Sequence, residues 1–199
     1  MTTKGNMFGA SNLSAKDRAD LDFYGTPPDC VNDLLEREAF SKNIWEPACG
    51  SGLISKTLKD NGFKVLSSDI IDRGYNDFVY DFLSDDKIKL NSLIQGKFDI
   101  ITNPPYKSAQ KFIERAIEYI ADGHKIAMLL KLTFIESGGR FQFFQMFPPK
   151  IIYAYSRRRD CWPNGIKPEK ESHMIAYAWF IWEKRNSIDK HDTILDWIF

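Results

Sequence analysis

Near the middle of the 199-residue chain stands the stretch FDIITNPPY, residues 98–106. Its first part, Phe98–Thr102, is largely apolar and rich in isoleucine, which is typical of a buried strand. A helical pattern follows over Lys107–Ile120. The tetrapeptide Asn103-Pro104-Pro105-Tyr106 is therefore expected on a loop that leaves the end of a strand, where open α/β sheets place their chemistry.

Strand-like and helix-like segments alternate along the rest of the chain. Strand patterns occupy residues 44–45, 63–67, 78–82, 98–102, 125–132, 151–156 and 174–183, and helix patterns residues 27–39, 53–59, 108–121 and 140–146. The alternation predicts an α/β fold with a mostly parallel seven-stranded sheet and helices on both faces. The last two strands lack an intervening helix, so we expect them to pair as an antiparallel ribbon at one sheet edge.

Three divisions of the chain are expected. Residues 1–22 are polar and weakly periodic and are interpreted as an N-terminal arm. Residues 23–184 carry the strand and helix patterns and form one domain, and residues 185–199 are interpreted as a C-terminal tail. At the start of the domain, Thr26 is predicted to cap a helix whose first residue is Pro27.

The composition limits the possible partners and compartments. Lys plus Arg and Asp plus Glu each number 27, so any surface for nucleic acid must be a local patch. The three cysteines are far apart, which predicts free thiols in a reducing cytoplasm and no metal site. No apolar run approaches the roughly 20 residues that span a bilayer, so no membrane association is expected.

A second motif, Glu46-Pro47-Ala48-Cys49-Gly50-Ser51-Gly52, joins a predicted strand to a helix. Glycines allow a close approach of the backbone to a ligand, and Asp69, at the end of the next strand, is placed to accept ribose hydroxyls. A dinucleotide site would require a third glycine where Ser55 stands, and Glu46 would repel a pyrophosphate. Glu46 would instead attract a cationic ligand such as S-adenosylmethionine. A nicotinamide or flavin site and a purely structural loop are the alternatives.

Three nearby residues fit an adenosyl ligand. Ile70 can pack on one face of the adenine, and Asp81 and Phe82 can accept a bond from its amine and cover its edge; a surface turn is the alternative for Asp81. Cys49 is interpreted as a small packing residue rather than a nucleophile.

The tetrapeptide is suited to hold a planar amine. Such an amine is a poor nucleophile because its lone pair is delocalised, and oxygen acceptors on its hydrogens allow the nitrogen to pyramidalise. The Asn103 side-chain oxygen and the Pro104 carbonyl are the expected acceptors. The prolines stiffen the turn, and Tyr106 offers a face for stacking a base. The alternative is an ordinary proline turn.

Taken together, these motifs resemble those of the S-adenosylmethionine-dependent, adenine-specific amino-methylating DNA methyltransferases, in particular their short phage or prophage members. The resemblance covers about residues 23–183 and implies a Rossmann-like methyltransferase fold. It implies that residues Glu46–Gly52, Asp69, Asp81 and Phe82 bind the donor and that Asn103–Tyr106 are catalytic. Asn103 is also expected to line the donor site. By the same resemblance, the segment Phe23-Tyr24-Gly25-Thr26-Pro27 closes over the methionine end of the donor, with Phe23 and Thr26 in the pocket.

Sequence-specific members of that group carry a separate recognition domain, for which this chain has no room. The remaining candidates for contact with DNA are the arm and the loop 157–173, where Arg157, Arg158 and Arg159 can bind phosphates and Trp162 can stack on a base. A solvated hairpin loop is the alternative. A short target, low specificity or a partner recognition subunit would each fit.

The expected activity is transfer of a methyl group to N6 of adenine in DNA. Alternatives are another planar amine, such as cytosine N4, an RNA base or a protein glutamine, and a non-catalytic donor-binding subunit.

Overall fold

The computed structural model of the chain describes residues 23–85, 97–170, 173–185 and 192–199; the predicted arm, residues 1–22, lies outside them. Four α-helices are described: α2 (Pro28–Arg37), α3 (Leu53–Asp60), α5 (Ala109–Tyr119) and α6 (Phe141–Met146). Short 3₁₀ turns occupy Tyr106–Ser108 (η1), Leu132–Ile135 (η2) and Gly138–Arg140 (η3). The strands are β1 (Tyr24–Gly25), β2 (Asn43–Glu46), β3 (Lys64–Asp69), β4 (Phe78–Val79), β5 (Asp99–Thr102), β6 (Lys125–Lys131), β7 (Ile151–Tyr155), β8 (Trp162–Pro163), β9 (Tyr177–Glu183) and β10 (Ile194–Ile198).

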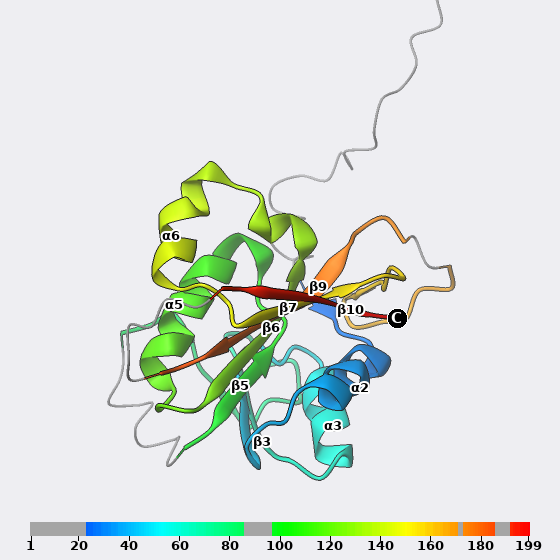
Figure 1. Cartoon of the computed structure of the whole chain (residues 1–199). Coiled ribbons are helices and arrows are strands. Elements are labelled where there is room, and N and C mark those ends of the chain that lie inside the picture. Colours follow the sequence, from blue (N-terminus) through cyan, green and yellow to red (C-terminus); the bar gives the residue numbers. More distant parts are fainter. Residues whose placement is uncertain (1–22, 86–96, 171–172, 186–191) are drawn as a thin grey trace, which may run out of the picture.

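The main sheet has eight strands in the order β10-β7-β9-β6-β5-β2-β3-β4 (Figure 1). All are parallel except β9, which runs antiparallel to both β6 and β7. The predicted α/β class and the antiparallel pairing of the last two predicted strands are confirmed. Two details differ: the sheet has one strand more than expected, and the β7–β9 pair is not its edge.

The extra strand comes from residues assigned to a tail. β10 pairs in parallel with β7, and Ile198 is buried among the side chains beneath that strand. Its other apolar residues, among them Ile194 and Trp197, are exposed. The apolar pattern of β10 is too short to predict a strand from the local sequence. Its conformation depends on pairing with β7, which lies about 40 residues away in the sequence.

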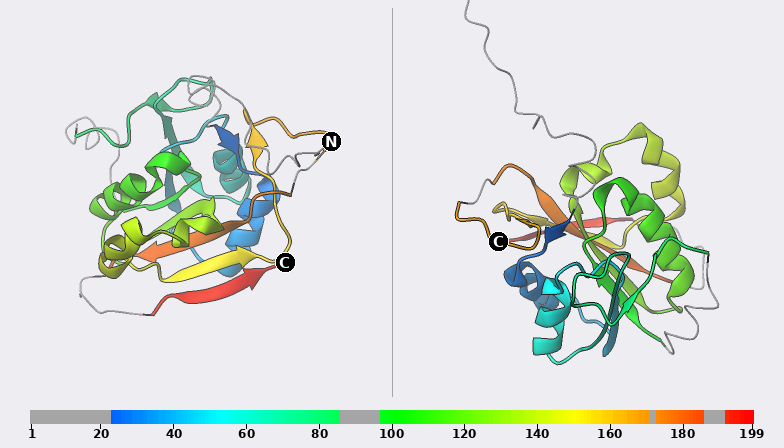
Figure 2. Two further views of the ribbon diagram at one scale, coloured as in Figure 1. Left: turned by 90° about the horizontal axis from the view of Figure 1, so that it is seen from above. Right: turned by 180° about the vertical axis from the view of Figure 1, so that it is seen from behind.

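Helices cover both faces of the sheet, as Figures 1 and 2 show: α2 and α3 lie on one face and α5 and α6 on the other. The two faces correspond to two apolar clusters. One contains Ile113 of α5 and Phe143 of α6 with Trp45, and the other contains Leu34 of α2 and Leu58 of α3 with Trp179. Alternate residues of the strands supply the two layers, because neighbouring side chains on a strand point to opposite faces.

Parallel strands bring several loops to one edge of the sheet. The loops after β2, β3, β5, β6 and β7 all leave from the carboxyl ends of their strands. The glycine loop, Asp69, the tetrapeptide and the loop 157–173 therefore share this edge, although they are far apart in the sequence.

A small ribbon lies at the same edge. Tyr24 and Gly25 of β1 pair antiparallel with Pro163 and Trp162 of β8. Here the predicted cap is wrong: α2 begins at Pro28 after Pro27, with no side-chain cap. The Thr26 hydroxyl instead meets the side-chain nitrogen of Asn103 at 3.1 Å.

Within the described residues, the longest apolar helix falls short of what is needed to cross a membrane.

The opposite, amino-terminal edge is held by Asp99, whose side chain is buried. Its carboxylate accepts hydrogen bonds from the backbone N–H of Ser41 at 2.6 Å and of Lys125 at 2.9 Å, and lies 2.7 Å from His124 Nδ1. One carboxylate thus ties two other segments of the chain, at Ser41 and at His124–Lys125, to the start of β5.

We predict that Asp99→Asn lowers the free energy of unfolding by about 1–3 kcal/mol, because the amide can no longer accept from every one of these donors. The exposed Asp122→Asn is the control and should change stability little. Urea denaturation measures both, and equal stability of the two variants would show that Asp99 is not the tie.

Candidate functional site

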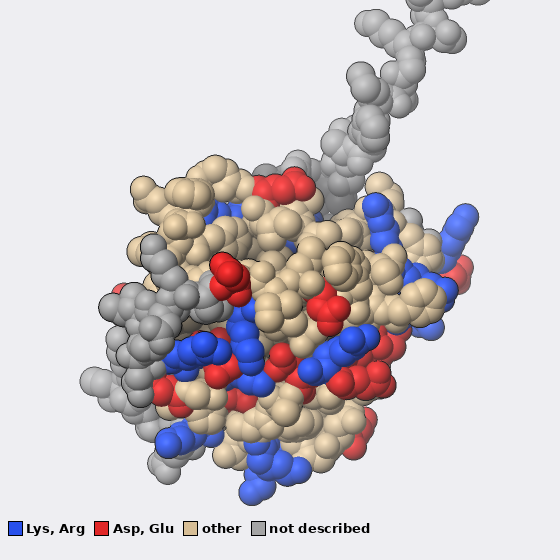
Figure 3. Space-filling model, viewed as in Figure 1, with Lys and Arg blue, Asp and Glu red and all other residues tan. Residues whose placement is uncertain are grey.

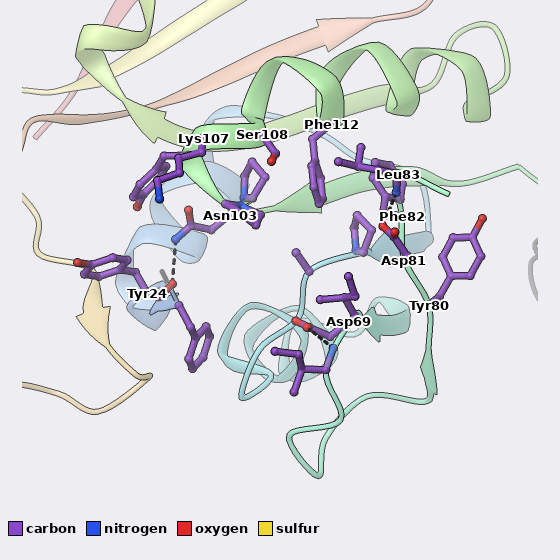
Figure 4. Close-up of a pocket in the computed structure, with 18 of the residues that line it drawn as sticks. Tyr24, Asp69, Tyr80, Asp81, Phe82, Leu83, Asn103, Lys107, Ser108 and Phe112 are labelled. Atoms are coloured by element: carbon purple, nitrogen blue, oxygen red, sulfur yellow. Dashed lines mark hydrogen bonds between the residues drawn. The ribbon is translucent and has the colours of Figure 1, made fainter. Parts of the chain in front are cut away.

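A cavity of about 380 Å³ opens at the carboxyl edge of the sheet. Figure 4 shows Asn103 and Asp69 facing it from opposite sides. The predicted site residues in its wall are Phe23, Pro47, Ala48, Asp69, Ile70, Asp81, Phe82, Asn103, Pro104, Pro105 and Tyr106. Thr26, Glu46 and Cys49 surround a smaller adjoining hollow, which Phe23, Ala48 and Asn103 also line.

The glycine loop is shaped by Phe23. Gly50 has φ +54°, and a Cβ there would lie 1.8 Å from the Phe23 ring. Gly52 has φ +79°, and a Cβ there would overlap the Tyr75 ring at 2.1 Å. Both positions therefore require glycine for backbone conformation and for space. The close approach that the sequence predicts toward a ligand is made here toward the protein's own aromatic rings.

Asp69 holds this loop in place. Its Oδ2 accepts the N–H of Gly50 at 2.8 Å, and its Oδ1 accepts the N–H of Ile71 at 3.0 Å. Although largely buried, the carboxylate is part of the cavity wall. It is thus placed between the glycine loop and the cavity, as a group that contacts a ribose would need to be.

Glu46 is 1% exposed, and the Ser55 hydroxyl donates to its carboxyl. Ser55 Oγ is also 2.7 Å from Ser67 Oγ, which fixes the position of the hydroxyl. Burial raises the pKa of the Glu46 carboxyl to about 8, and the nearby Asp69 charge adds to this rise. A cation bound beside this carboxyl would lower its pKa and favour loss of the proton.

The side chain of Asn103 has a defined orientation. Its Nδ2 donates to the Tyr24 carbonyl at 3.0 Å and to Thr26 Oγ1 at 3.1 Å, and lies 3.9 Å from Cys161 Sγ. A backbone carbonyl can only accept, so the nitrogen must be the atom facing Tyr24. Oδ1 is left on the opposite side and accepts no hydrogen bond from the residues that the structure describes (Figure 4).

The two prolines differ in the use of their carbonyls. The Pro105 carbonyl accepts the N–H of Ser108 at 2.9 Å and closes turn η1. Pro104 is buried and lines the cavity, and its carbonyl has no such partner among the described residues. The two acceptors predicted from the sequence, on Asn103 and Pro104, thus accept no hydrogen bond from the described residues.

The Tyr106 ring lies between neighbouring aromatic and cationic groups. It stacks on Tyr24 with centroids 6.1 Å apart, and Tyr177 is at 6.0 Å. Lys131 Nζ is 4.8 Å from its centroid. This ammonium stands over a ring that a planar substrate would use for stacking.

The three residues predicted to contact adenine have unequal surroundings. Ile70 is 61% exposed in the wall of the cavity. Asp81 is exposed and its Oδ1 accepts the N–H of Leu83 at 2.9 Å, whereas Phe82 is buried against Trp45 and Phe112. Burial raises the pKa of the Cys49 thiol, which keeps it protonated and agrees with a packing role.

The residues predicted to bind nucleic acid line a second hollow, which shares no lining residue with the main cavity. Arg159 forms ion pairs with Asp29 and Asp33 of α2, so it fastens the loop to the helix. Arg158 donates to the carbonyls of His173 and Met174. Among the residues that the structure describes, Arg159 is thus paired with acids and Arg158 is not.

Sequence reasoning missed several residues of the cavity. Tyr24, Arg73, Lys107, Ser108 and Phe112 all line it. Tyr24 stands inside the closing segment and Lys107 directly follows the tetrapeptide, so their proximity to the motifs was the available signal. Arg73, whose guanidinium lies 4.7 Å from the Phe23 ring centroid, had none. Within the described residues, no group of three metal-ligating side chains comes together.

Neither a family model nor a curated protein sequence matches the chain. Solved structures do match. A candidate class I S-adenosylmethionine-dependent methyltransferase from Listeria monocytogenes superposes with a TM-score of 0.56 at 17% identity, covering 85% of this chain and 63% of that one. A candidate RNA methyltransferase from Pyrococcus horikoshii gives 0.52 at 17% identity, covering 83% and 89%.

A modification subunit of a candidate type I restriction enzyme from Vibrio vulnificus gives a TM-score of 0.52 at 14% identity, covering 85% of this chain and 46% of that one. The chain thus spans less than two thirds of the Listeria and Vibrio chains. These likenesses show that it has the Rossmann-like fold of class I methyltransferases. The loop Glu46–Gly52, Asp69 and the tetrapeptide Asn103–Tyr106 lie around a cavity at the carboxyl edge of that fold.

We predict that Glu46 makes stability depend on pH. The folded protein keeps the proton to about pH 8, whereas the unfolded chain releases it near 4.5. The contribution to stability is therefore complete below pH 4.5 and lost as pH rises toward 8, with a limiting slope of about 1.4 kcal/mol per pH unit.

Glu46→Gln should lack this loss, because its amide oxygen still accepts from Ser55 and does not ionise. Urea unfolding between pH 5 and 8 should show the variant gaining on the wild type as pH rises. The exposed Glu36→Gln is the control, and parallel curves for wild type and Glu46→Gln would contradict the prediction.

Proposed function

We propose that this protein is an S-adenosylmethionine-dependent methyltransferase that methylates the exocyclic N6 amine of adenine in DNA. The observation that carries the proposal is the orientation of Asn103. Both hydrogens of its amide are directed to Tyr24 and Thr26, so its oxygen stays an acceptor beside the open Pro104 carbonyl. Two oxygen acceptors on a rigid turn suit an amine and not a carbonyl or a phosphate.

The residues around the cavity fit the proposed donor. Glu46 lies in the hollow that adjoins the cavity and would face the ammonium of the methionine part, and Asp69 would accept the ribose hydroxyls. Ile70 and Phe82 supply apolar walls for the adenine, and Asp81 an acceptor for its amine. When bound, S-adenosylmethionine would supply an electrophilic methyl group on a sulfonium, whose sulfur leaves as a neutral thioether.

The chain's own contribution to the reaction is to prepare the amine. Asn103 Oδ1 and the Pro104 carbonyl would accept its two hydrogens, which pulls the lone pair out of conjugation and directs it toward the donor. Held in this way, the amine nitrogen would accept the methyl group that the donor supplies, and its extra proton would afterwards leave to solvent. The rigid turn lowers the barrier mainly through positioning, because φ of both prolines is restricted.

A set of cations supports nucleic acid as the substrate. Six basic residues on the loops of the carboxyl edge form no ion pair within the described residues: Lys107, Lys131, Arg140, Arg157, Arg158 and Lys167. Arg140 donates to the carbonyls of Phe134 and Glu136, and Arg158 donates to the carbonyl of His173. Lys131, Arg157 and Lys167 each lie over an aromatic ring.

Figure 3 shows several basic side chains projecting from the loop between β7 and β9, with an acidic group beside them. A neutral chain with a local cluster of free cations is suited to bind a polyanion.

The substrate class is tested by supplying labelled donor with unmethylated duplex DNA, structured RNA and a protein extract in separate reactions. Digestion then identifies the labelled unit. Label in N6-methyladenine of DNA is expected. Label confined to RNA, to cytosine or to glutamine would reassign the substrate, and no label with intact donor binding would favour a non-catalytic subunit.

Asn103→Ala should reduce methyl transfer by roughly 100-fold or more, because the amine loses one of two acceptors that position it. Donor binding, measured by calorimetry, should persist. Asn43→Ala, at the opposite edge of the sheet, is the control for loss of an asparagine. Simultaneous loss of transfer and donor binding in Asn103→Ala would mean that the catalytic loop is misassigned.

The free cations are tested by the double variant Arg157→Gln/Lys167→Gln. Its matched control is Lys64→Gln/Lys97→Gln, which removes the same charge from the amino edge. For a duplex oligonucleotide, the slope of log Kd against log salt should fall by about two units in the first variant only. Equal slopes in the two variants would place the nucleic acid elsewhere on the molecule.

A further inference from the structure

We propose that Thr26 is a positioning residue that keeps the Asn103 amide in its acceptor orientation, instead of a contact of the methyl donor. The inference rests on the proposed function, since it concerns the same site. It assigns to Thr26 a role in holding the amine that is methylated, whereas its place in the closing segment predicted a contact with the methyl donor.

The geometry separates Thr26 from the main cavity. Its side chain is 2% exposed and lines the small hollow under the cavity, together with Tyr24, Glu46 and Asn103. Its hydroxyl oxygen is 3.1 Å from Asn103 Nδ2, at hydrogen-bond distance. No cap of helix α2 uses this hydroxyl, although the sequence favours one.

An asparagine amide can turn by 180° about its last torsion and exchange its oxygen and nitrogen. In the turned state Oδ1 would face the Tyr24 carbonyl, and two acceptors would oppose each other. The NH₂ group would then point at the target amine, which needs acceptors. Tyr24 and Thr26 together supply both acceptors that the correct orientation needs, so neither amide hydrogen is left without a partner.

The holding groups are anchored from two parts of the chain. Tyr24 belongs to β1, which pairs with β8, and the Asn164 N–H donates to the Phe23 carbonyl at 2.9 Å. Cys161, one residue before β8, places its sulfur 3.9 Å from the same nitrogen. The β1–β8 ribbon and Cys161 therefore contact the nitrogen of the Asn103 amide, while Oδ1 is left for the target amine.

Two substitutions at Thr26 test the role. Thr26→Val keeps the shape and removes the acceptor, and Thr26→Ser keeps the hydroxyl. Single-turnover methylation at saturating donor should be about tenfold slower for Thr26→Val, which corresponds to one hydrogen bond, and close to wild type for Thr26→Ser. The donor Kd, measured by calorimetry, should stay within about twofold for both variants. A weaker donor Kd with an unchanged rate would make Thr26 a donor contact and overturn the proposal.

A second measurement does not depend on activity. The Asn103 side-chain NH₂ signals are assigned in a ¹⁵N-labelled protein by their loss in Asn103→Asp. In Thr26→Val one of the two protons should shift upfield and exchange faster with water, and in Thr26→Ser neither should. Unchanged signals in Thr26→Val would overturn the inference even if the wild type methylates none of the substrates. An inactive wild type with the expected shifts would overturn only the proposed function.

Discussion

The hydrogen bond from the Asn103 side chain to the Tyr24 carbonyl joins segments that are 79 residues apart in the sequence. It depends on the parallel sheet, which brings the loop after β5 to the edge where the β1–β8 ribbon crosses. Because a carbonyl can only accept, this one contact orients the amide and leaves its oxygen open. The role proposed for the adjacent proline turn depends on that orientation of the amide.

The two carboxyl groups of the site, those of Glu46 and Asp69, are both buried. Glu46 is enclosed with Ser55 and Ser67, and burial raises the pKa of its carboxyl to about 8. Asp69 remains beside the cavity but uses backbone N–H groups to hold the glycine loop. The two carboxyl groups thus have different partners, a serine hydroxyl for Glu46 and backbone N–H groups for Asp69.

The basic residues of the loop 157–173 differ in whether an acid pairs with them. Arg159 is used to fasten the loop 157–173 to α2, while the nearby Arg158 and Lys167 keep charges that no acid within the described residues neutralises. Three consecutive arginines therefore do not act alike. A binding surface predicted from a basic run needs this distinction, because a paired arginine contributes little attraction to phosphate.

Much of the fold follows from local patterns. Residues 108–121 were expected to be helical and α5 covers Ala109–Tyr119, and the apolar run before Asn103 forms β5. The motifs around Glu46, Asp69 and Asn103 could likewise be read from spacing, because strand ends in a parallel sheet share an edge. The sequence by itself thus determined the fold class, the two loops and their closeness. Only the tertiary structure decided that β10 extends the sheet, that Thr26 faces Asn103 and that Arg159 is paired, because each depends on a partner far away in the chain.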